Sequence, residues 1–267
     1  MESDRASWTA LGAASNRAMH LFVDDPPPIL RDEWALRGLA VIRNRYAEDR
    51  LRRAIARGVR HYVLLGAGLD SFAHREPALA GQVAVFEVDH PFGQRAKQEM
   101  LSDLRAPSAP SLVYVPVDFE TESLADRLGR AGFRRDLPAF FSWLGVTIYL
   151  SGAAIFSTLE FVRRCAWGTE IVFEYSLPLE ILPREEQQLL RASIARCEAR
   201  GERFESYFEP HTRAARLQAL GFTEVVDFGP KEAREAYLAG RSDSLWFSEL
   251  SHLMRASVGM PACGPES

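Results

Sequence analysis

Short apolar runs alternate with amphipathic stretches through the middle of the chain, and this rhythm predicts strands and helices in turn. The expected strands span 62–65, 83–89, 112–118, 138–143 and 170–175. Strands that alternate with helices form a mostly parallel sheet with both faces covered. The pattern therefore predicts an α/β fold.

Helical spacing of apolar residues accounts for the stretches between the later strands. A helix is expected over 121–131, and Ser151 is expected to cap the helix that follows the fourth strand. A polar helix over 184–200 then interrupts the rhythm. The rhythm resumes with a helix over 212–220, a strand over 223–228, a helix over 231–238 and a last strand over 245–255.

The rhythm also suggests how the chain is divided. Residues 1–58 carry helical patterns that break at three consecutive prolines, which cannot continue a helix. We expect them to form a helical extension whose alternative roles are a lid over the site and simple packing. The core is expected over 59–258, with a helical insert over 181–208, and residues 259–267 are expected to be a flexible tail.

Composition limits the classes of partner. A net charge of −4 gives no overall field that attracts nucleic acid or anionic membrane. No apolar run approaches the ~18–20 residues of a membrane span, and the charged N-terminus is unlike a secretory signal. Cys165, Cys197 and Cys263 are too few and scattered for a disulfide framework or a cysteine-based metal site. We therefore expect a cytoplasmic protein without a metal, a membrane or a nucleic acid as partner.

A glycine-containing turn, Gly66-Ala67-Gly68, follows the first strand. Ser71 stands where a dinucleotide fold has its third glycine, and no Gly-Lys-Ser/Thr follows. Asp70 beside the turn would repel a pyrophosphate and tolerates a cationic or zwitterionic ligand. S-adenosylmethionine has a sulfonium, an ammonium group and no phosphate, so it fits this turn.

The next two strands each end in an acid. A carboxylate at Asp89, 21 residues after Gly68, can accept hydrogen bonds from both ribose hydroxyls. Asp118 and Phe119 suit an adenine, because one side chain can accept from its amine and the other offers an apolar wall. Three successive strand ends therefore favour an adenosyl ligand over acids that merely cap helices.

These stretches resemble the leucine carboxyl methyltransferase family, whose members use S-adenosylmethionine. The bacterial branch, which includes polyketide carboxyl O-methyltransferases of the tetracenomycin type, is the most similar. The motifs that carry the resemblance span 63–75, 85–91, 115–119, 143–150 and 173–175, with weaker similarity over 237–243.

The resemblance implies a Rossmann-like, seven-stranded sheet with its last strand antiparallel. It also implies that Gly66, Asp89 and the Asp118-Phe119 pair contact the cofactor. In the family an arginine before the first strand holds the methionyl carboxylate; Arg45 is the better match and Arg43 the alternative. The expected cofactor-binding set is completed by Ala67, Gly68, His90 and Ser142.

One position departs from the family pattern. Many relatives carry a glutamate just before the glycine of the fourth-strand motif, where this chain has Leu144. A contact to the polar end of the cofactor is therefore lost, or is made by the backbone.

The expected reaction is O-methylation of a small molecule such as a polyketide or another secondary metabolite. A carboxylate acceptor, with a pKa of about 4, needs no general base, whereas a phenol, with a pKa of about 10, usually needs one. Tyr149 is the candidate base, and His20, His90 and His211 are expected to be structural or surface residues rather than catalytic ones. An NAD-dependent oxidoreductase and a non-catalytic cofactor-binding module are the alternatives.

The insert ends in aromatic residues that are candidates for contact with the methyl acceptor. These are Phe204, Tyr207 and Phe208. They could line the binding site of a ring-shaped acceptor or pack the insert onto the sheet, and the sequence leaves both roles open.

Overall fold

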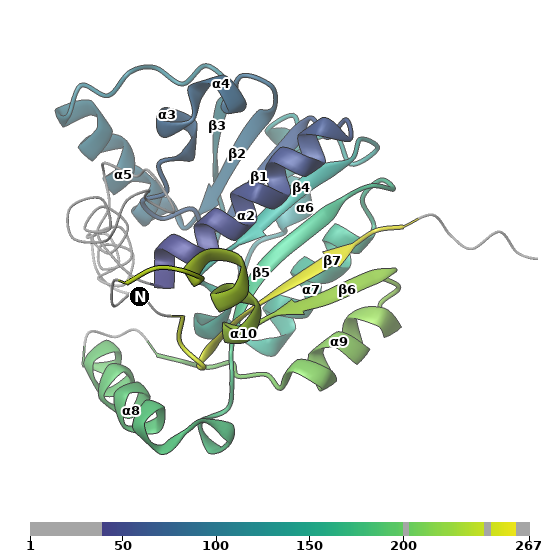
Figure 1. Cartoon of the computed structure of the whole chain (residues 1–267). Helices are drawn as coiled ribbons and strands as arrows, with labels where there is room; N and C mark the ends of the chain where they lie inside the picture. The colour runs from purple at the N-terminus through teal and green to yellow at the C-terminus, as the bar shows by residue number, and fades with distance from the viewer. Residues whose placement is uncertain (1–38, 200–202, 243–246, 260–267) are drawn as a thin grey trace, which may run out of the picture.

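The computed structural model describes residues 39–199, 203–242 and 247–259 (Figure 1). Its centre is a seven-stranded sheet in the order β3-β2-β1-β4-β5-β7-β6. The strands are β1 (His61–Leu65), β2 (Ala84–Asp89), β3 (Leu112–Pro116), β4 (Ala139–Trp143), β5 (Glu170–Ser176), β6 (Glu224–Phe228) and β7 (Ser251–Ser257).

The strand directions confirm the expected Rossmann-like sheet. The strands β1 to β5 pair in parallel, and β7 runs antiparallel to both of its neighbours, β5 and β6. The chain goes from β1 outward to β2 and β3, and then returns to the other side of β1 at β4. Ligands of such sheets bind where the strand order reverses, at the carboxyl ends of the strands. The end of β1 is that point here.

Helices cover both faces of the sheet. One apolar cluster includes residues of α6 (Leu124–Arg130), α7 (Gly152–Arg163) and α9 (Pro210–Ala219). The other includes residues of α2 (Leu39–Ala56), α3 (Phe72–Arg75), α4 (Pro77–Ala80) and α10 (Pro230–Ala233). The remaining helical segments are α5 (Pro91–Asp103), η1 (Thr147–Tyr149), η2 (Leu179–Ile181), α8 (Arg184–Glu198) and η3 (Arg234–Leu238).

Several local expectations are confirmed. The Ser151 hydroxyl accepts a hydrogen bond from the Ala154 amide at 3.2 Å and so caps α7. The predicted apolar faces of α6 and α7 are buried. Two expectations near the C-terminal end were wrong, whereas the bounds of the other predicted elements differ by at most three residues. The last strand begins at Ser251, where its pairing with β5 begins, and the helix expected over 231–238 changes at Arg234 into a π-helical turn.

The helix α2 packs directly on the sheet. Its residues Val41, Ile42, Leu51 and Ala54 have no exposed surface. The predicted residues 1–38 of the extension, and positions 260–267 of the tail, lie outside the described residues. The domain boundaries and the lid role stay predictions.

The insert between β5 and α9 is attached at both ends. Figure 1 shows α8 at the end of the sheet where β5 finishes. The Glu205 amide donates to the Ile148 carbonyl at 2.7 Å, and the Ser206 hydroxyl donates to the Leu150 carbonyl at 2.5 Å. The insert therefore contacts the segment that follows β4. In the described part of the chain, no helix has the length and apolar character needed to cross a membrane.

Replacing Leu51 with alanine should lower the free energy of unfolding by about 2–5 kcal/mol, because it leaves a cavity between α2 and the sheet. The measurement is urea denaturation. Arg53→Ala, at an exposed position of the same helix, is the matched control and should change stability by about 0.5 kcal/mol or less. Equal effects of the two substitutions would contradict the packing of α2 as part of the core.

Candidate functional site

The turn after β1 depends on two glycines. Gly66 has φ +65° and Gly68 has φ +50°, in the left-handed region that other residues rarely adopt. The Ala67 amide donates to the Val88 carbonyl at 3.0 Å, so the turn is tied to the neighbouring strand β2. The expected glycine turn therefore lies at the carboxyl edge of the sheet.

Glycine is also required there for close packing. A Cβ on Gly66 would lie 2.3 Å from a Val146 methyl group, which is far inside contact distance. Close packing also applies to Gly145, which lies after β4. It has φ +73°, and a Cβ on it would lie 2.8 Å from the Arg43 guanidinium. The segment after β4 and an arginine of α2 thus both lie close to this part of the edge.

Asp89 lies at the end of β2 and faces the turn. One carboxylate oxygen accepts from the Gly68 amide at 2.6 Å, and the other accepts from the His90 amide at 2.7 Å. Burial raises the pKa of this carboxyl, and the two amide donors act in the opposite direction. A carboxylate oxygen accepts more than one hydrogen bond, so both oxygens keep capacity for a ligand hydroxyl.

Other predicted residues follow the carboxyl ends of β2 and β3. His90 caps α5, since its Nδ1 accepts from the Phe92 amide at 3.4 Å. Asp118 follows β3, the strand next to β2, and its carboxylate accepts from the Glu120 amide at 3.0 Å. The ring of Phe119 lies 6.0 Å from that of Trp143, at the end of β4.

Ser142 is held inside the sheet. Its side chain is buried on β4, and its hydroxyl is hydrogen-bonded to the Tyr62 hydroxyl of β1 at 3.0 Å. This bond joins the two strands that flank the switch point. Ser142 therefore supports the strands beneath the edge.

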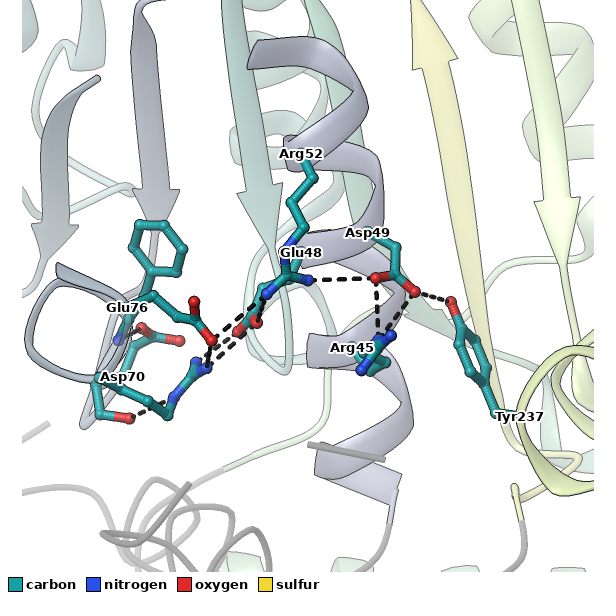
Figure 2. A network of polar contacts seen from close by, with 10 residues as sticks. Arg45, Glu48, Asp49, Arg52, Asp70, Glu76 and Tyr237 are labelled. Atoms are coloured by element: carbon teal, nitrogen blue, oxygen red, sulfur yellow. Dashed lines mark hydrogen bonds and ion pairs between the residues drawn. The ribbon is translucent and has the colours of Figure 1, made fainter. Parts of the chain in front are cut away.

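The two candidate arginines of α2 point to different places. Arg45 contacts the Asp49 carboxylate at 2.9 Å, and Asp49 also accepts from the Tyr237 hydroxyl at 3.0 Å. Figure 2 shows Arg45 on the Tyr237 side of α2, with Asp70 on the opposite side. The side chain of Arg45 is 38% exposed.

Arg43 is the arginine that lies beside Gly145. It pairs with Glu174 of β5 at 2.5 Å, with side chains only 11% and 8% exposed. Its Nε is buried and has no hydrogen-bond partner in the described part of the protein. An unpaired buried donor on a guanidinium is costly, and a carboxylate is the group that best satisfies it.

A polar network fixes the short helix α3 that follows the turn (Figure 2). Glu48 of α2 pairs with Arg75 of α3 at 2.5 Å, and both side chains are almost fully buried. Burial raises the pKa of Glu48, and the Arg75 guanidinium counteracts this effect. Arg52 contacts Glu48 and also Glu76, at 3.7 and 3.4 Å. The turn is therefore connected to α2 through α3.

Tyr149 lies in η1, between the edge and the insert. Its ring lies 5.3 Å from that of Phe204 in a T-shaped contact. Phe208 has a packing role, because the Arg213 guanidinium lies 3.2 Å from its ring centroid and its amide donates to the Ser176 carbonyl. Among the described residues of the insert, Phe204 is thus an aromatic residue that contacts the candidate base.

Sequence reasoning missed three groups near this edge. The first is the Arg43–Glu174 pair. The second is Lys97 of α5, which contacts Glu87 and the turn. The third joins Tyr175, Asp227 and His252, because Asp227 accepts from the Tyr175 hydroxyl at 2.7 Å and contacts His252 Nδ1 at 2.8 Å. Each group joins separate elements, so the local signal was limited to the acids Glu87 and Glu174, which interrupt the apolar runs of β2 and β5.

Metal ligands do not gather in this region. Within the described ranges, no three His, Cys, Asp or Glu side chains are grouped as a metal site would require.

Comparison with known proteins supports the same kind of ligand. The leucine carboxyl methyltransferase family profile matches residues 31–163. A Bacillus subtilis protein named "Putative S-adenosyl-L-methionine-dependent methyltransferase YktD" is 30% identical over 240 residues, which cover 87% of this chain and 77% of that protein. A Frankia alni protein of the same description is 40% identical over 122 residues, covering 45% of this chain and 41% of its own length.

A solved structure supports the fold. The crystal structure of a "possible exported protein" from Bordetella parapertussis superposes with a TM-score of 0.51 at 14% identity, covering 83% of this chain and 70% of that one. Similarity at this identity concerns the fold alone. The sequence relatives, together with the glycine turn and Asp89, show that this chain belongs to the leucine carboxyl methyltransferase family and is an S-adenosylmethionine-dependent methyltransferase.

Proposed function

We propose that this methyltransferase transfers its methyl group to an oxygen atom of a small molecule, either a carboxylate or a phenolic hydroxyl. A polyketide or another secondary metabolite is the proposed class of acceptor. The observation that carries the proposal is the placement of the glycine turn, Asp89 and Tyr149 at one edge of the sheet. We also propose a cytoplasmic location, because three scattered cysteines in 267 residues do not provide a disulfide framework.

The residues at the edge fit the cofactor. Gly66, Ala67 and Gly68 form a turn without side chains that would obstruct a ligand, and Asp89 is the acceptor for the ribose hydroxyls. His90 holds the start of α5 beside that acid. In this proposal Asp118 and Phe119 recognise the adenine, and Ser142 supports β4 from below.

Arg43 is the proposed partner of the methionyl carboxylate. Its buried, unpaired Nε supports this assignment over Arg45, whose guanidinium contacts Asp49. Glu174 holds Arg43 from the other side. Because Leu144 lies among apolar neighbours, we propose Glu174 as the nearby acid that balances charge at this end of the site.

Methyl transfer requires the protein mainly to align the two reactants and to exclude water. When bound, the cofactor would supply an electrophilic methyl group: an acceptor oxygen would attack the methyl carbon in line with the carbon–sulfur bond, and S-adenosylhomocysteine would leave as the neutral thioether. A carboxylate acceptor is already ionised at neutral pH, so the chain only has to orient it and exclude water. Tyr149 and Phe204 are the proposed contacts on the acceptor side, and Tyr149 is the proposed base when the acceptor is a phenol.

Replacing Gly66 with alanine should weaken S-adenosylhomocysteine binding at least tenfold, because the added Cβ meets Val146 and requires a strained φ. Isothermal titration calorimetry gives the affinity. Gly132→Ala is the control, since Gly132 also has a positive φ but faces open space. Unchanged affinity in the Gly66 variant would refute the placement of the cofactor at this turn.

Replacing Arg43 with alanine should weaken S-adenosylhomocysteine binding about tenfold or more, the effect of losing one charge-assisted contact. Arg45→Ala removes the same charge from the same helix and should stay within about threefold of the wild type. Calorimetry on both variants measures the difference. The opposite ranking would restore Arg45 as the carboxylate ligand.

Radiolabelled S-adenosylmethionine should transfer methyl groups to members of a panel of small aromatic carboxylic acids and phenols. A carboxylate product is an ester that mild alkali cleaves, whereas a phenol product is a stable ether. Tyr149→Phe should lower the rate by about 10²-fold or more for phenols and by much less for carboxylates. Methylation found only on nitrogen, sulfur or carbon would contradict the proposal.

A further inference from the structure

We propose that Lys97 is a positioning residue that fixes the exit of the cofactor turn by holding the carbonyl of Asp70. The proposal rests on the placement of the cofactor at the turn, and it assigns a function to a buried lysine. Lys97 lies in α5, whose start is beside Asp89.

The lysine ammonium contacts two groups from different elements. Its Nζ lies 2.6 Å from the Asp70 carbonyl oxygen and 2.5 Å from a carboxylate oxygen of Glu87. The side chains of Lys97 and Glu87 are 4% and 1% exposed. Glu87 lies two residues before Asp89 in β2, so both acids are on one face of that strand.

The remaining contacts of the turn explain why this one matters. The entry is tied to β2 through the Ala67 amide, and the middle is tied to Asp89 through the Gly68 amide. The Asp70 carboxylate accepts a hydrogen bond from the Phe72 amide at 2.8 Å, at the first residue of α3. The Asp70 carbonyl is held by Lys97, so this contact fixes the end of the turn relative to β2 and α5.

A contribution to folding stability does not by itself explain the buried ion pair between Lys97 and Glu87. Burial raises the pKa of Glu87 to about 7 despite the adjacent ammonium. The other carboxylate oxygen of Glu87 is buried without a hydrogen-bond partner in the described part of the chain. Two apolar side chains of similar size often replace a buried ion pair without loss of stability. They could not hold a backbone carbonyl, and that contact is what Lys97 adds.

The test compares variants that distinguish an effect of Lys97 on protein stability from an effect on the position of the turn. Lys97→Met leaves the Glu87 carboxylate buried without its cation, which destabilises the protein. The double variant Lys97→Met/Glu87→Leu removes both charges and keeps an apolar core. It should unfold within a few degrees of the wild type, yet bind S-adenosylhomocysteine at least tenfold more weakly by calorimetry.

A second readout reports on the turn directly. Hydrogen exchange of the Asp70 and Phe72 amides should become at least tenfold faster in the double variant without ligand, while amides of β4 and β5 keep their protection. Arg50→Met is the control, because it removes a buried ion pair with Glu170 at the start of β5. That variant should bind S-adenosylhomocysteine as the wild type does.

Two results would overturn the proposal. One is a double variant with wild-type affinity and wild-type exchange at the turn. The other is an equal loss of protection throughout the sheet, which would make Lys97 purely structural. If Gly66→Ala also has wild-type affinity, the cofactor placement itself fails; if Gly66→Ala weakens binding and the double variant does not, only the role of Lys97 fails.

Discussion

The bond from the Gly68 amide to the Asp89 carboxylate is the contact on which the site depends. It requires a left-handed glycine after β1, a half-buried acid at the end of β2, and two adjacent parallel strands whose carboxyl ends lie side by side. The bond fixes the turn against the strand, and it orients a carboxylate whose oxygens can still accept from a ligand. The switch-point topology provides the position, and in the proposed site these residues bind the adenosyl group.

Buried charges of two helices hold this arrangement from either side. Glu48 of α2 pairs with Arg75 just after the turn, and Lys97 of α5 contacts the carbonyl of Asp70. On the β4 side, Arg43 of α2 reaches Gly145 and Glu174. Buried ion pairs add little net stability, whereas their geometry is specific. The helices that cover this face of the sheet therefore also determine the shape of the edge.

Much of the fold could be predicted because its signals are local. The apolar strand runs, the Ser151 cap and the Gly66-Ala67-Gly68 turn each depend on a few neighbouring residues, and all three are found as expected. Asp89 was identifiable because it directly ends a strand. The last strand was placed too early, because its pairing with β5 depends on the distant Ser176.

The remaining features depend on how separate elements pack. Arg43 and Arg45 differ by about 200° around α2, and the sequence does not say which of them faces Gly145. Tyr175, Asp227 and His252 meet only because β7 lies between β5 and β6, an order that no local pattern encodes. The same holds for Lys97, whose partners come from β2 and the turn. The proposed acceptor contacts, Tyr149 and Phe204, likewise come from separate segments, so no local pattern in the sequence identifies the acceptor.

Calorimetry of S-adenosylhomocysteine binding to the wild type and to Asp89→Ala tests the central claim most directly. If Asp89 orders the turn and accepts the ribose hydroxyls, the wild type binds and the variant loses at least a hundredfold in affinity while it remains folded. Equal affinity in the two proteins would contradict this account and place the adenosyl group elsewhere on the sheet.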